Sequence, residues 1–308
     1  MLTAFSNHVI VDSVRVYPPK PFALICGGEV GTIVDKEPKS LRDAFLRGGG
    51  VDAFKNANTL EIEKIEEFFD KESPYIDLVK FEADMAQICE MVLLFSESPG
   101  SFTELGSFAM IEGMSEKILV AIQGKYTSKS TFITKGPLAN LRREHPKSVY
   151  SFADATVDII NGNLSTVNCD KLVKILIKPI ADRLDEIETK TSLQRNNFNH
   201  LCKLYVGILR ESYCLKDDEI ILLLDEFGFH VQQQLLDRVA CCCKVLGWSS
   251  TLTSGFDRVH FALDAPREAA KISFKPPLMD KIRRRAEFRN YWVKEDSDRV
   301  SAVDQVRK

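Results

Sequence analysis

The sequence contains cysteine and histidine but lacks the spacings in which they usually bind metals. Its eight cysteines include no C-x-x-C pair, and its five histidines never occur as H-x-x-x-H. Adjacent Cys241, Cys242 and Cys243 cannot converge on one ion from a helix, because successive helical side chains diverge by about 100°. These absences disfavour a zinc site, so we expect no bound metal and reduced thiols.

Long hydrophobic runs are also missing, and we expect no secretory leader. No stretch reaches the roughly 18 apolar residues that a membrane-spanning helix needs. The first residues lack a basic start followed by an apolar run. We therefore expect a cytoplasmic protein with no membrane partner.

The chain does have an ordinary globular composition. It has 308 residues, of which 44% are hydrophobic and 28% charged, and its formal net charge is −3. This length holds roughly two domains. The overall charge argues neither for nor against a nucleic-acid partner, but basic residues are concentrated in residues 275–308.

Three apolar runs of strand length alternate with helical patterns in the first half. They occupy residues 22–26, 91–95 and 118–122. Wholly apolar runs bounded by turn residues are typical of buried strands in a parallel sheet. We therefore expect an α/β domain over residues 1–150, with a Rossmann-like or flavodoxin-like parallel sheet.

The second half has a different pattern. Helical spacings at residues 200–213, 217–227 and 232–246 precede two short strand-like runs around Ser254-Gly255. Three helices followed by a hairpin outline a winged helix, although an arbitrary helical cap on the first domain is the alternative. The expected divisions are a helical linker (151–198), a winged-helix-like domain (199–272) and a basic and aromatic tail (273–308).

The largest group of candidate functional residues directly follows the apolar run at residues 91–95. Ser98-Pro99-Gly100-Ser101 is strong turn chemistry, and Glu104 stands three residues after Ser101, the spacing of a capping box. This turn lies at the carboxyl edge of the expected sheet, where open α/β folds bind their ligands. Glu97 and Glu104 are therefore candidate catalytic carboxylates, and the turn is a candidate substrate contact. In the structural alternative, Glu104 only caps its helix and Glu97 is solvated.

A carboxylate beside a bound sugar can attack or electrostatically support the anomeric carbon. The transition state resembles an oxocarbenium ion, which a nearby negative charge stabilises. A carboxylate nucleophile divides the reaction into glycosylation and hydrolysis of the enzyme ester. Nicotinamide, already cationic in NAD, would leave without a general acid, which is consistent with a chain that has few histidines.

Two segments carry a resemblance to a known family. They read Ile25-Cys26-Gly27-Gly28-Glu29 and Phe95-Ser96-Glu97-Ser98-Pro99-Gly100-Ser101-Phe102-Thr103-Glu104-Leu105-Gly106-Ser107-Phe108. The chain resembles the nucleoside 2-deoxyribosyltransferase-like effectors of bacterial retron anti-phage systems, over residues 20–145 well and beyond them only in layout. The resemblance implies that Glu104 is the catalytic nucleophile and that Glu97 and Glu82 are supporting acids, although the transferases tend to have Asp where this chain has Glu82.

The same resemblance implies substrate, partners and pocket. Effectors of this kind are regarded as N-glycosidases acting on NAD or nucleotides, without a cofactor, and their C-terminal part is winged-helix-like. They accompany a reverse transcriptase and its branched RNA–DNA hybrid, which restrain them until infection. The transferases complete their sites across subunits, which leaves room for a homo-oligomer. The implied substrate-binding residues are Cys26, Gly27, Gly28, Glu29, Ser98, Gly100 and Ser101.

Basic residues of the second half are candidate contacts to nucleic acid. They are Arg238, Lys244, Arg258, Arg283, Arg284 and Arg285. Basic residues near Phe288, Tyr291 and Trp292 suit backbone contacts and base stacking, whereas a docked amphipathic helix is the alternative for this segment. A nucleotide-sensing winged-helix regulator without turnover is therefore the alternative to an enzyme.

Overall fold

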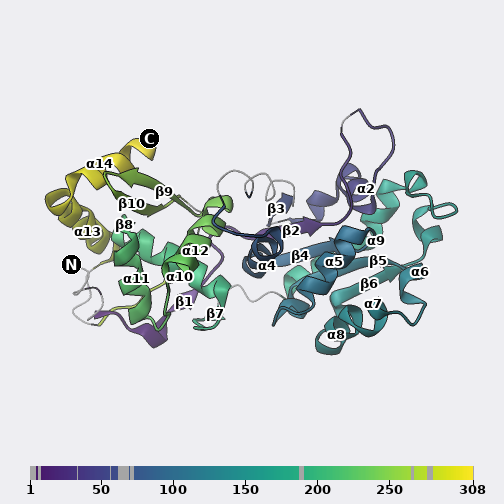
Figure 1. Cartoon of the computed structure of the whole chain (residues 1–308), viewed down its shortest axis with the longest axis horizontal. Coiled ribbons are helices and arrows are strands. Elements are labelled where there is room, and N and C mark those ends of the chain that lie inside the picture. The colour runs from purple at the N-terminus through teal and green to yellow at the C-terminus, as the bar shows by residue number, and fades with distance from the viewer. Residues whose placement is uncertain are drawn as a thin grey trace. The chain divides into compact units, whose positions relative to one another are not determined.

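The chain forms two compact units. The computed structural model describes residues 5, 8–32, 34–55, 57–61, 69, 73–186, 191–264, 267–275 and 280–307. The sheet unit comprises residues 21–70 and 77–187, and the helical unit combines residues 1–20, 71–76 and 188–308 (Figure 1). Each unit therefore has its own fold, and each is described by itself below.

The sheet unit is built on five parallel strands. They are β2 (Phe22–Cys26), β3 (Asn58–Glu61), β4 (Met91–Phe95), β5 (Ile118–Gln123) and β6 (Val149–Phe152), in the order β3-β2-β4-β5-β6. Strands β2, β4 and β5 are buried along their whole length, which explains their unbroken apolar sequences. The three predicted strands are confirmed, whereas β3 and β6 were missed because polar residues interrupt them at the two edges of the sheet.

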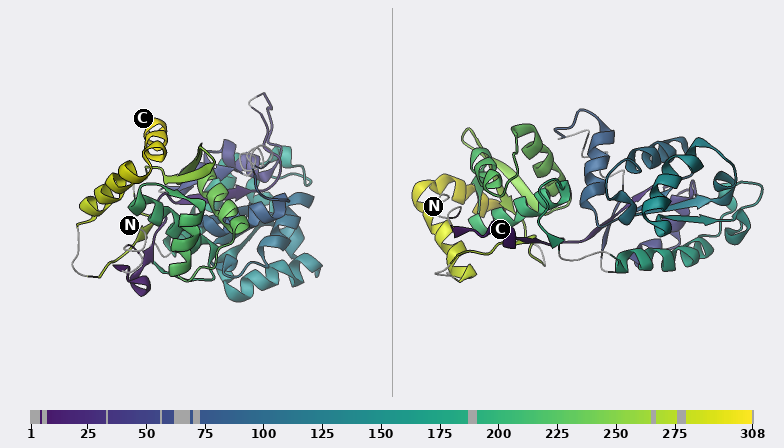
Figure 2. Two further views of the ribbon diagram at one scale, coloured as in Figure 1. Left: turned by 60° about the vertical axis from the view of Figure 1, so that its left-hand side comes forward. Right: turned by 90° about the horizontal axis from the view of Figure 1, so that it is seen from below.

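Helices cover both faces of this sheet (Figure 2). Helices α2 (Leu41–Arg47) and α9 (Cys169–Asp185) share a buried core with one set of alternating strand residues, which includes Ile25 and Leu93. Helices α4 (Leu78–Ile88) and α5 (Pro99–Phe108) pack beside each other on the other face. The shorter elements are α6 (Gly124–Thr127), α7 (Phe132–Lys135), α8 (Pro137–Glu144) and 3-10 turns at Gly50–Phe54, Met114–Glu116, Pro146–Ser148, Asp154–Val157 and Leu164–Thr166.

The strand order identifies the place where a ligand is expected. In chain order the strands run 2-1-3-4-5, the doubly wound arrangement of the flavodoxin type. The chain leaves β2 toward one edge of the sheet and leaves β4 toward the other, so the two loops diverge and create a crevice at the carboxyl ends. The expected Rossmann-like parallel sheet is confirmed, and its switch point lies between β2 and β4.

The helical unit contains three helices followed by a hairpin, as the sequence predicts. They are α10 (Phe198–Ser212), α11 (Asp217–Glu226), α12 (Gln233–Val245), β9 (Ser249–Ser254) and β10 (Asp257–Ala262). Strand β8 (Leu215–Lys216) completes an antiparallel sheet in the order β8-β10-β9. The remaining elements are the 3-10 turn Val11–Ser13, β1 (Arg15–Val16), β7 (Thr191–Ser192), β11 (Ala270–Lys271), α13 (Lys281–Glu295) and α14 (Ser297–Val306).

The unit boundaries differ from the expected divisions of the chain. Residues 1–20 belong to the helical unit, because β1 pairs antiparallel with both β7 and β11. Most of the expected linker belongs to the sheet unit, because α9 buries Leu172, Leu176 and Ile180 against the sheet. Neither assignment was accessible from local sequence, since both depend on contacts between residues far apart in the chain.

The expected tail is a docked helix, which was the alternative for this segment. Phe288 and Trp292 of α13 are 2% and 4% exposed, and Trp292 Nε1 donates to the carbonyl oxygen of Ser212 at 2.9 Å. These two aromatic rings are therefore part of the core of the helical unit and unavailable for base stacking. Across the described ranges, no helix is both long and apolar enough to cross a membrane.

Candidate functional site

The loop after β4 ends in a capping box, but three residues earlier than expected. Ser98 is the N-cap of α5, and its Oγ accepts a hydrogen bond from Ser101 N at 3.2 Å. Ser101 Oγ in turn accepts from Ser98 N at 2.8 Å. Pro99 at the first helical position has a backbone angle suited to this start. The predicted Ser101–Glu104 capping box is therefore wrong, and Glu104 lies one turn further into the helix.

Glu97 is hydrogen-bonded to the backbone of the neighbouring loop. Its carboxylate accepts from Gly28 N at 3.1 Å, from Leu41 N at 2.6 Å and from Arg42 N at 3.2 Å. Burial raises the pKa of the Glu97 carboxyl, and the three amides only partly oppose this rise. Glu97 thus joins the loop after β2 to the start of α2, and the solvated alternative is wrong. Its role as a supporting catalytic acid stays a prediction.

Gly27 and Gly28 allow this loop to close on Glu97. A Cβ on Gly28 would lie 2.7 Å from Ser40 Cβ and 3.1 Å from Glu97 Oε1. Gly27 has a φ of +153°, and a Cβ there would lie 2.9 Å from Phe95 Cβ. Any side chain at either position would displace the loop, so the glycine pair has a steric reason beyond a generic turn.

Three predicted site residues interact electrostatically at the carboxyl end of β2. Cys26 is fully buried, which raises the pKa of its thiol well above the usual value, and the negative charges of Glu104 and Glu82 raise it further. Both carboxylates therefore act on the same sulfur, Glu104 from α5 and Glu82 from α4. The guanidinium of Arg42 acts in the opposite direction on this thiol. The result is a cluster of acidic charge at the switch point.

The two acids of this cluster are partly shielded from water. Glu82 is 9% exposed, and Glu104 is half-buried with its Oε2 atom inaccessible to solvent. Two further predicted residues lie farther out, since Gly100 is exposed and the side chain of Glu29 is 75% exposed. The shielded carboxylates interact more strongly with a developing cation than exposed ones would.

Ser96 is a buried polar residue next to Glu97 that the sequence did not single out. It follows β4 directly and is fully buried, and its Oγ has no hydrogen-bond partner among the residues that the structure describes. Side chains alternate along β4, so Ser96 shares a face with Leu94, opposite to the α2 and α9 core that Leu93 and Phe95 join. A polar residue immediately after a wholly apolar strand was the signal available in the sequence.

The predicted basic contacts of the helical unit are largely engaged inside it. Arg258 pairs with Asp217 at 3.0 Å and also with Asp237. The guanidinium of Arg238 lies 5.7 Å from the ring centroid of Tyr75 and 5.3 Å from that of Phe198. These geometries are cation–π contacts. The side chains therefore have roles within the fold, and Lys244 of α12 is half-buried.

The basic run on α13 contains both arginines paired inside the unit and an exposed one. Arg284 and Arg285 hold opposite oxygens of the buried Glu211 carboxylate, at 2.5 Å and 2.7 Å. Arg283, in contrast, is 74% exposed and makes a 3.3 Å pair with Glu287 on its own helix. Of these three arginines, Arg283 is the one whose charge faces solvent.

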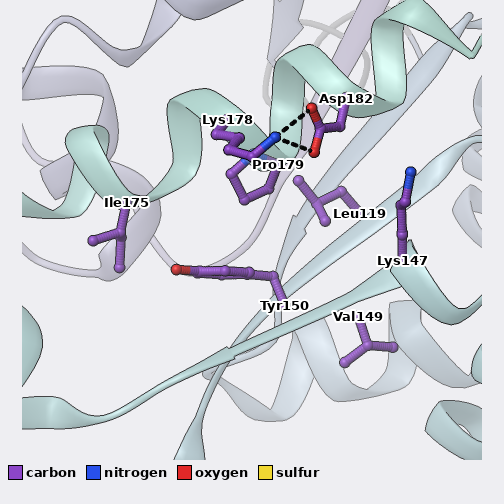
Figure 3. A pocket seen from close by; sticks show the side chains of 8 residues that line it. All are labelled: Leu119, Lys147, Val149, Tyr150, Ile175, Lys178, Pro179 and Asp182. Atoms are coloured by element: carbon purple, nitrogen blue, oxygen red, sulfur yellow. Dashed lines mark hydrogen bonds and ion pairs between the residues drawn. The ribbon is translucent and has the colours of Figure 1, made fainter.

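A cavity of about 370 Å³ lies elsewhere on the sheet unit (Figure 3). Tyr150 of β6 and Leu119 of β5 face Pro179 of α9 across it, and Lys178 forms an ion pair with Asp182 at its rim. Leu119 and α9 belong to the core on the face opposite to α4 and α5. This cavity is therefore separate from the acidic cluster.

Within the described ranges, no three His, Cys, Asp or Glu side chains are grouped so that they could hold a metal ion. Glu97 is bonded to the backbone amides of Gly28 and Leu41. The acidic cluster has two shielded carboxylates and lies with the buried Ser96 at the carboxyl edge of the sheet, where a ligand is expected in an open α/β fold.

Comparison with known proteins shows what the chain is similar to. A family model described as STM3845 retron effector protein matches residues 38–251. Two Escherichia coli proteins, of retrons Ec86 and Ec73, are each named "putative ribosyltransferase/DNA-binding protein". The first is 42% identical over 72 residues, 23% of this chain and 24% of the relative. The second is 30% identical over 79 residues, 26% of this chain and 25% of the relative, so each match spans about a quarter of the relative's length.

Proposed function

The chain belongs to the STM3845 retron effector family, and from this premise we propose that its sheet unit is an N-glycosidase that hydrolyses the base–ribose bond of NAD or a related nucleotide. The proposal takes Glu104 as nucleophile and the switch point between β2 and β4 as the substrate site. The names of the two retron relatives, which include ribosyltransferase, support a glycosyl-transfer chemistry.

The single observation that carries the proposal is that the carboxylates of Glu104 and Glu82 both act electrostatically on the buried thiol of Cys26 and raise its pKa. Two elements remote in sequence from β2 bring negative charge to the carboxyl end of that strand. A glycosidic bond that breaks there places positive charge on the sugar ring, and fixed carboxylates in a shielded site stabilise that charge.

The reaction has two steps. A Glu104 carboxylate oxygen attacks C1′ of the ribose while the bond to the base breaks, and the base leaves with the electron pair of that bond. Nicotinamide departs from NAD as a neutral molecule, so this step needs no proton. Water then attacks C1′ of the ester, restores the Glu104 carboxylate and releases one proton and the ribosyl product. Glu82 contributes negative charge in both steps.

The helical unit is proposed to be winged-helix-like and to contact retron components. Its helices α10 to α12 and the hairpin of β9 and β10 follow the order of that motif. The partners in this proposal are the reverse transcriptase and its branched RNA–DNA hybrid, which restrain the enzyme until infection. Since Arg258, Arg284 and Arg285 are paired inside the unit, Arg283 is the best placed of the predicted residues for a phosphate contact.

The test of the activity is base release by the purified full chain. Wild-type protein incubated with NAD should release nicotinamide, and a panel of nucleosides and nucleotides should be followed by chromatography in parallel. Glu104→Gln keeps the size of the side chain but removes the nucleophilic charge, so it should lower release at least 1,000-fold. Glu112→Gln, which changes an exposed carboxylate of the sheet unit outside the predicted site, is the matched control and should retain the wild-type rate.

Two outcomes would contradict the proposal. Full activity in Glu104→Gln would remove the catalytic assignment. Tight binding of NAD or a nucleotide without release of any base would favour the alternative, a nucleotide-sensing regulator.

A growth experiment tests the proposed restraint. Co-expression with the cognate reverse transcriptase and hybrid should relieve the growth defect that the effector alone causes, and unchanged growth in both cases would refute the restraint.

A further inference from the structure

Arg42 is a buried cation beside the glycine loop (residues 25–29) that the sequence did not single out. It is the second residue of α2, and it is only 2% exposed. A guanidinium is costly to bury unless hydrogen-bond acceptors and opposite charge compensate it. The burial of this side chain therefore indicates a role in the loop that it contacts.

The guanidinium of Arg42 holds two carbonyl groups of this loop. Its Nε donates to the carbonyl oxygen of Gly28 at 2.8 Å, and its Nη1 donates to that of Ile25 at 3.5 Å. These two carbonyl groups bracket Cys26 and Gly27, where β2 ends. One side chain thus holds the loop at both of its ends.

The backbone of Gly28 is held from two sides. Its N–H group donates to Glu97 Oε1 at 3.1 Å, and its carbonyl oxygen accepts from Arg42. The backbone N–H of Arg42 also donates to Glu97 Oε1, at 3.2 Å. These three residues therefore form a closed circuit of hydrogen bonds, and a shift of the guanidinium must move the loop or break one of the bonds.

The charge of Arg42 also acts on residues of the predicted site. Burial raises the pKa of the Cys26 thiol and of the Glu97 carboxyl, and the positive charge of Arg42 opposes the rise at both groups. The carboxylates of Glu104 and Glu82 raise the pKa of the same thiol. Arg42 therefore belongs to the same electrostatic environment as the proposed nucleophile.

We propose that Arg42 is a positioning residue, which holds the glycine loop in the conformation that receives the sugar of the substrate. The inference rests on the proposed function for its effect on activity, whereas the hold on the loop does not. A displacement of about 1 Å in a group that positions a substrate can lower a rate about 100-fold. Release of this loop should therefore affect catalysis, although Arg42 acts only through the loop.

The first measurement is amide hydrogen exchange in the full chain. Arg42→Met keeps an unbranched side chain but removes the charge and both carbonyl contacts, so exchange in peptides covering residues 25–29 should become about tenfold faster. Exchange in β4 and β5 should stay as in wild type, because the hydrogen-bond ladder between these strands does not involve Arg42.

Arg42→Lys is the conservative variant. It keeps the charge but loses the planar fork that reaches two carbonyl groups at once. Exchange in residues 25–29 should therefore be accelerated less than in Arg42→Met. This variant also decides the question if Arg42→Met does not fold.

Arg47→Met is the matched control. Arg47 lies on the same helix and holds the outer part of the segment between β2 and α2, where it donates to the carbonyl oxygens of Asp35 at 2.6 Å and Thr32 at 3.3 Å. This variant should accelerate exchange near residues 32–35 and leave residues 25–29 as in wild type. Equal acceleration of residues 25–29 in both methionine variants would contradict the assignment to Arg42.

Nicotinamide release from NAD by the same variants completes the test. Arg42→Met should lower kcat/KM about 100-fold and Arg42→Lys about tenfold, whereas Arg47→Met should retain the wild-type rate. Unchanged exchange of residues 25–29 in the Arg42 variants, or equally faster exchange throughout the sheet unit, would overturn the hold on the loop. Faster exchange there with a wild-type rate would overturn its effect on activity. If wild type releases no base from any substrate, the proposed function and that effect fail together, whereas the exchange result still decides the hold on the loop.

Discussion

The Glu97 carboxylate accepts a 2.6 Å hydrogen bond from the backbone amide of Leu41, 56 residues away in sequence. Leu41 is the first residue of α2, whose N-terminal amides have no partner within the helix itself. The bond fastens the loop after β4 to the helix that follows β2. The two loops of the switch point are therefore held together by one side chain that sequence reasoning assigned to catalysis.

The stability of the sheet unit should depend on pH through Glu97. Burial raises the pKa of this carboxyl in the folded state, so its protonated form is favoured by folding. The associated stabilisation is complete below the ordinary glutamate pKa of about 4.3 and is lost as pH rises through the raised value. In urea unfolding, the free energy of unfolding of wild type minus that of Glu97→Gln should therefore be largest near pH 4 and smaller at pH 7. A difference that grows with pH would contradict this assignment.

Replacing either of two glycines near the site with alanine should have opposite effects on the stability of the protein. At Gly28 the added Cβ would lie 2.7 Å from Ser40 Cβ, so Gly28→Ala should destabilise the protein by about 1–3 kcal/mol and lower base release. At Gly106, inside α5, the added Cβ meets nothing within 4 Å. Gly106→Ala should therefore stabilise the protein by about 0.5–1 kcal/mol. Urea unfolding measures both, and equal losses would contradict the steric account.

Asp217 should stabilise the helical unit at neutral pH. Burial alone would raise the pKa of this carboxyl, but hydrogen bonds from His260 and Arg258 lower it to about 2. A carboxyl whose pKa is lowered by folding stabilises the folded state at pH values above its ordinary pKa. This stabilisation is lost as the pH falls toward the pKa of the folded state. Asp217→Asn should thus cost about 2 kcal/mol at pH 7 and progressively less from pH 4 to pH 2. The neighbour Asp218→Asn is the control, and an equal cost there would contradict the account.

Local sequence predicted the elements better than the contacts. The apolar runs predicted β2, β4 and β5 because buried strands of a parallel sheet need no polar face. The start of α5 was misplaced because Ser98 and Ser101 both fit a cap, and Pro99 decides between them. The bonds of Glu97 to Gly28 and Leu41 join the loop after β4 to both ends of the loop between β2 and α2, which no local pattern encodes.

The charged residues of the helical unit also make contacts that local sequence does not reveal. A basic run at Arg283, Arg284 and Arg285 predicts a contact to nucleic acid, but the acid that holds two of these residues, Glu211, lies on another helix. Similarly, Tyr75 has no local feature that indicates its contact with Cys242. Pairing between distant residues therefore decided which predicted contacts stay available to a partner.

The most direct measurement of the central claim is chemical trapping of the glycosyl ester. NAD carrying fluorine in place of the 2′-hydroxyl, in the arabino configuration, slows hydrolysis of the ester, because fluorine destabilises the oxocarbenium-like transition state. Peptide mass spectrometry of the inactivated full chain should find one ribosyl-type adduct, on Glu104, with one equivalent of nicotinamide released. An adduct on Glu97 or Glu82, or continued release of nicotinamide with Glu104 unmodified, would contradict the account.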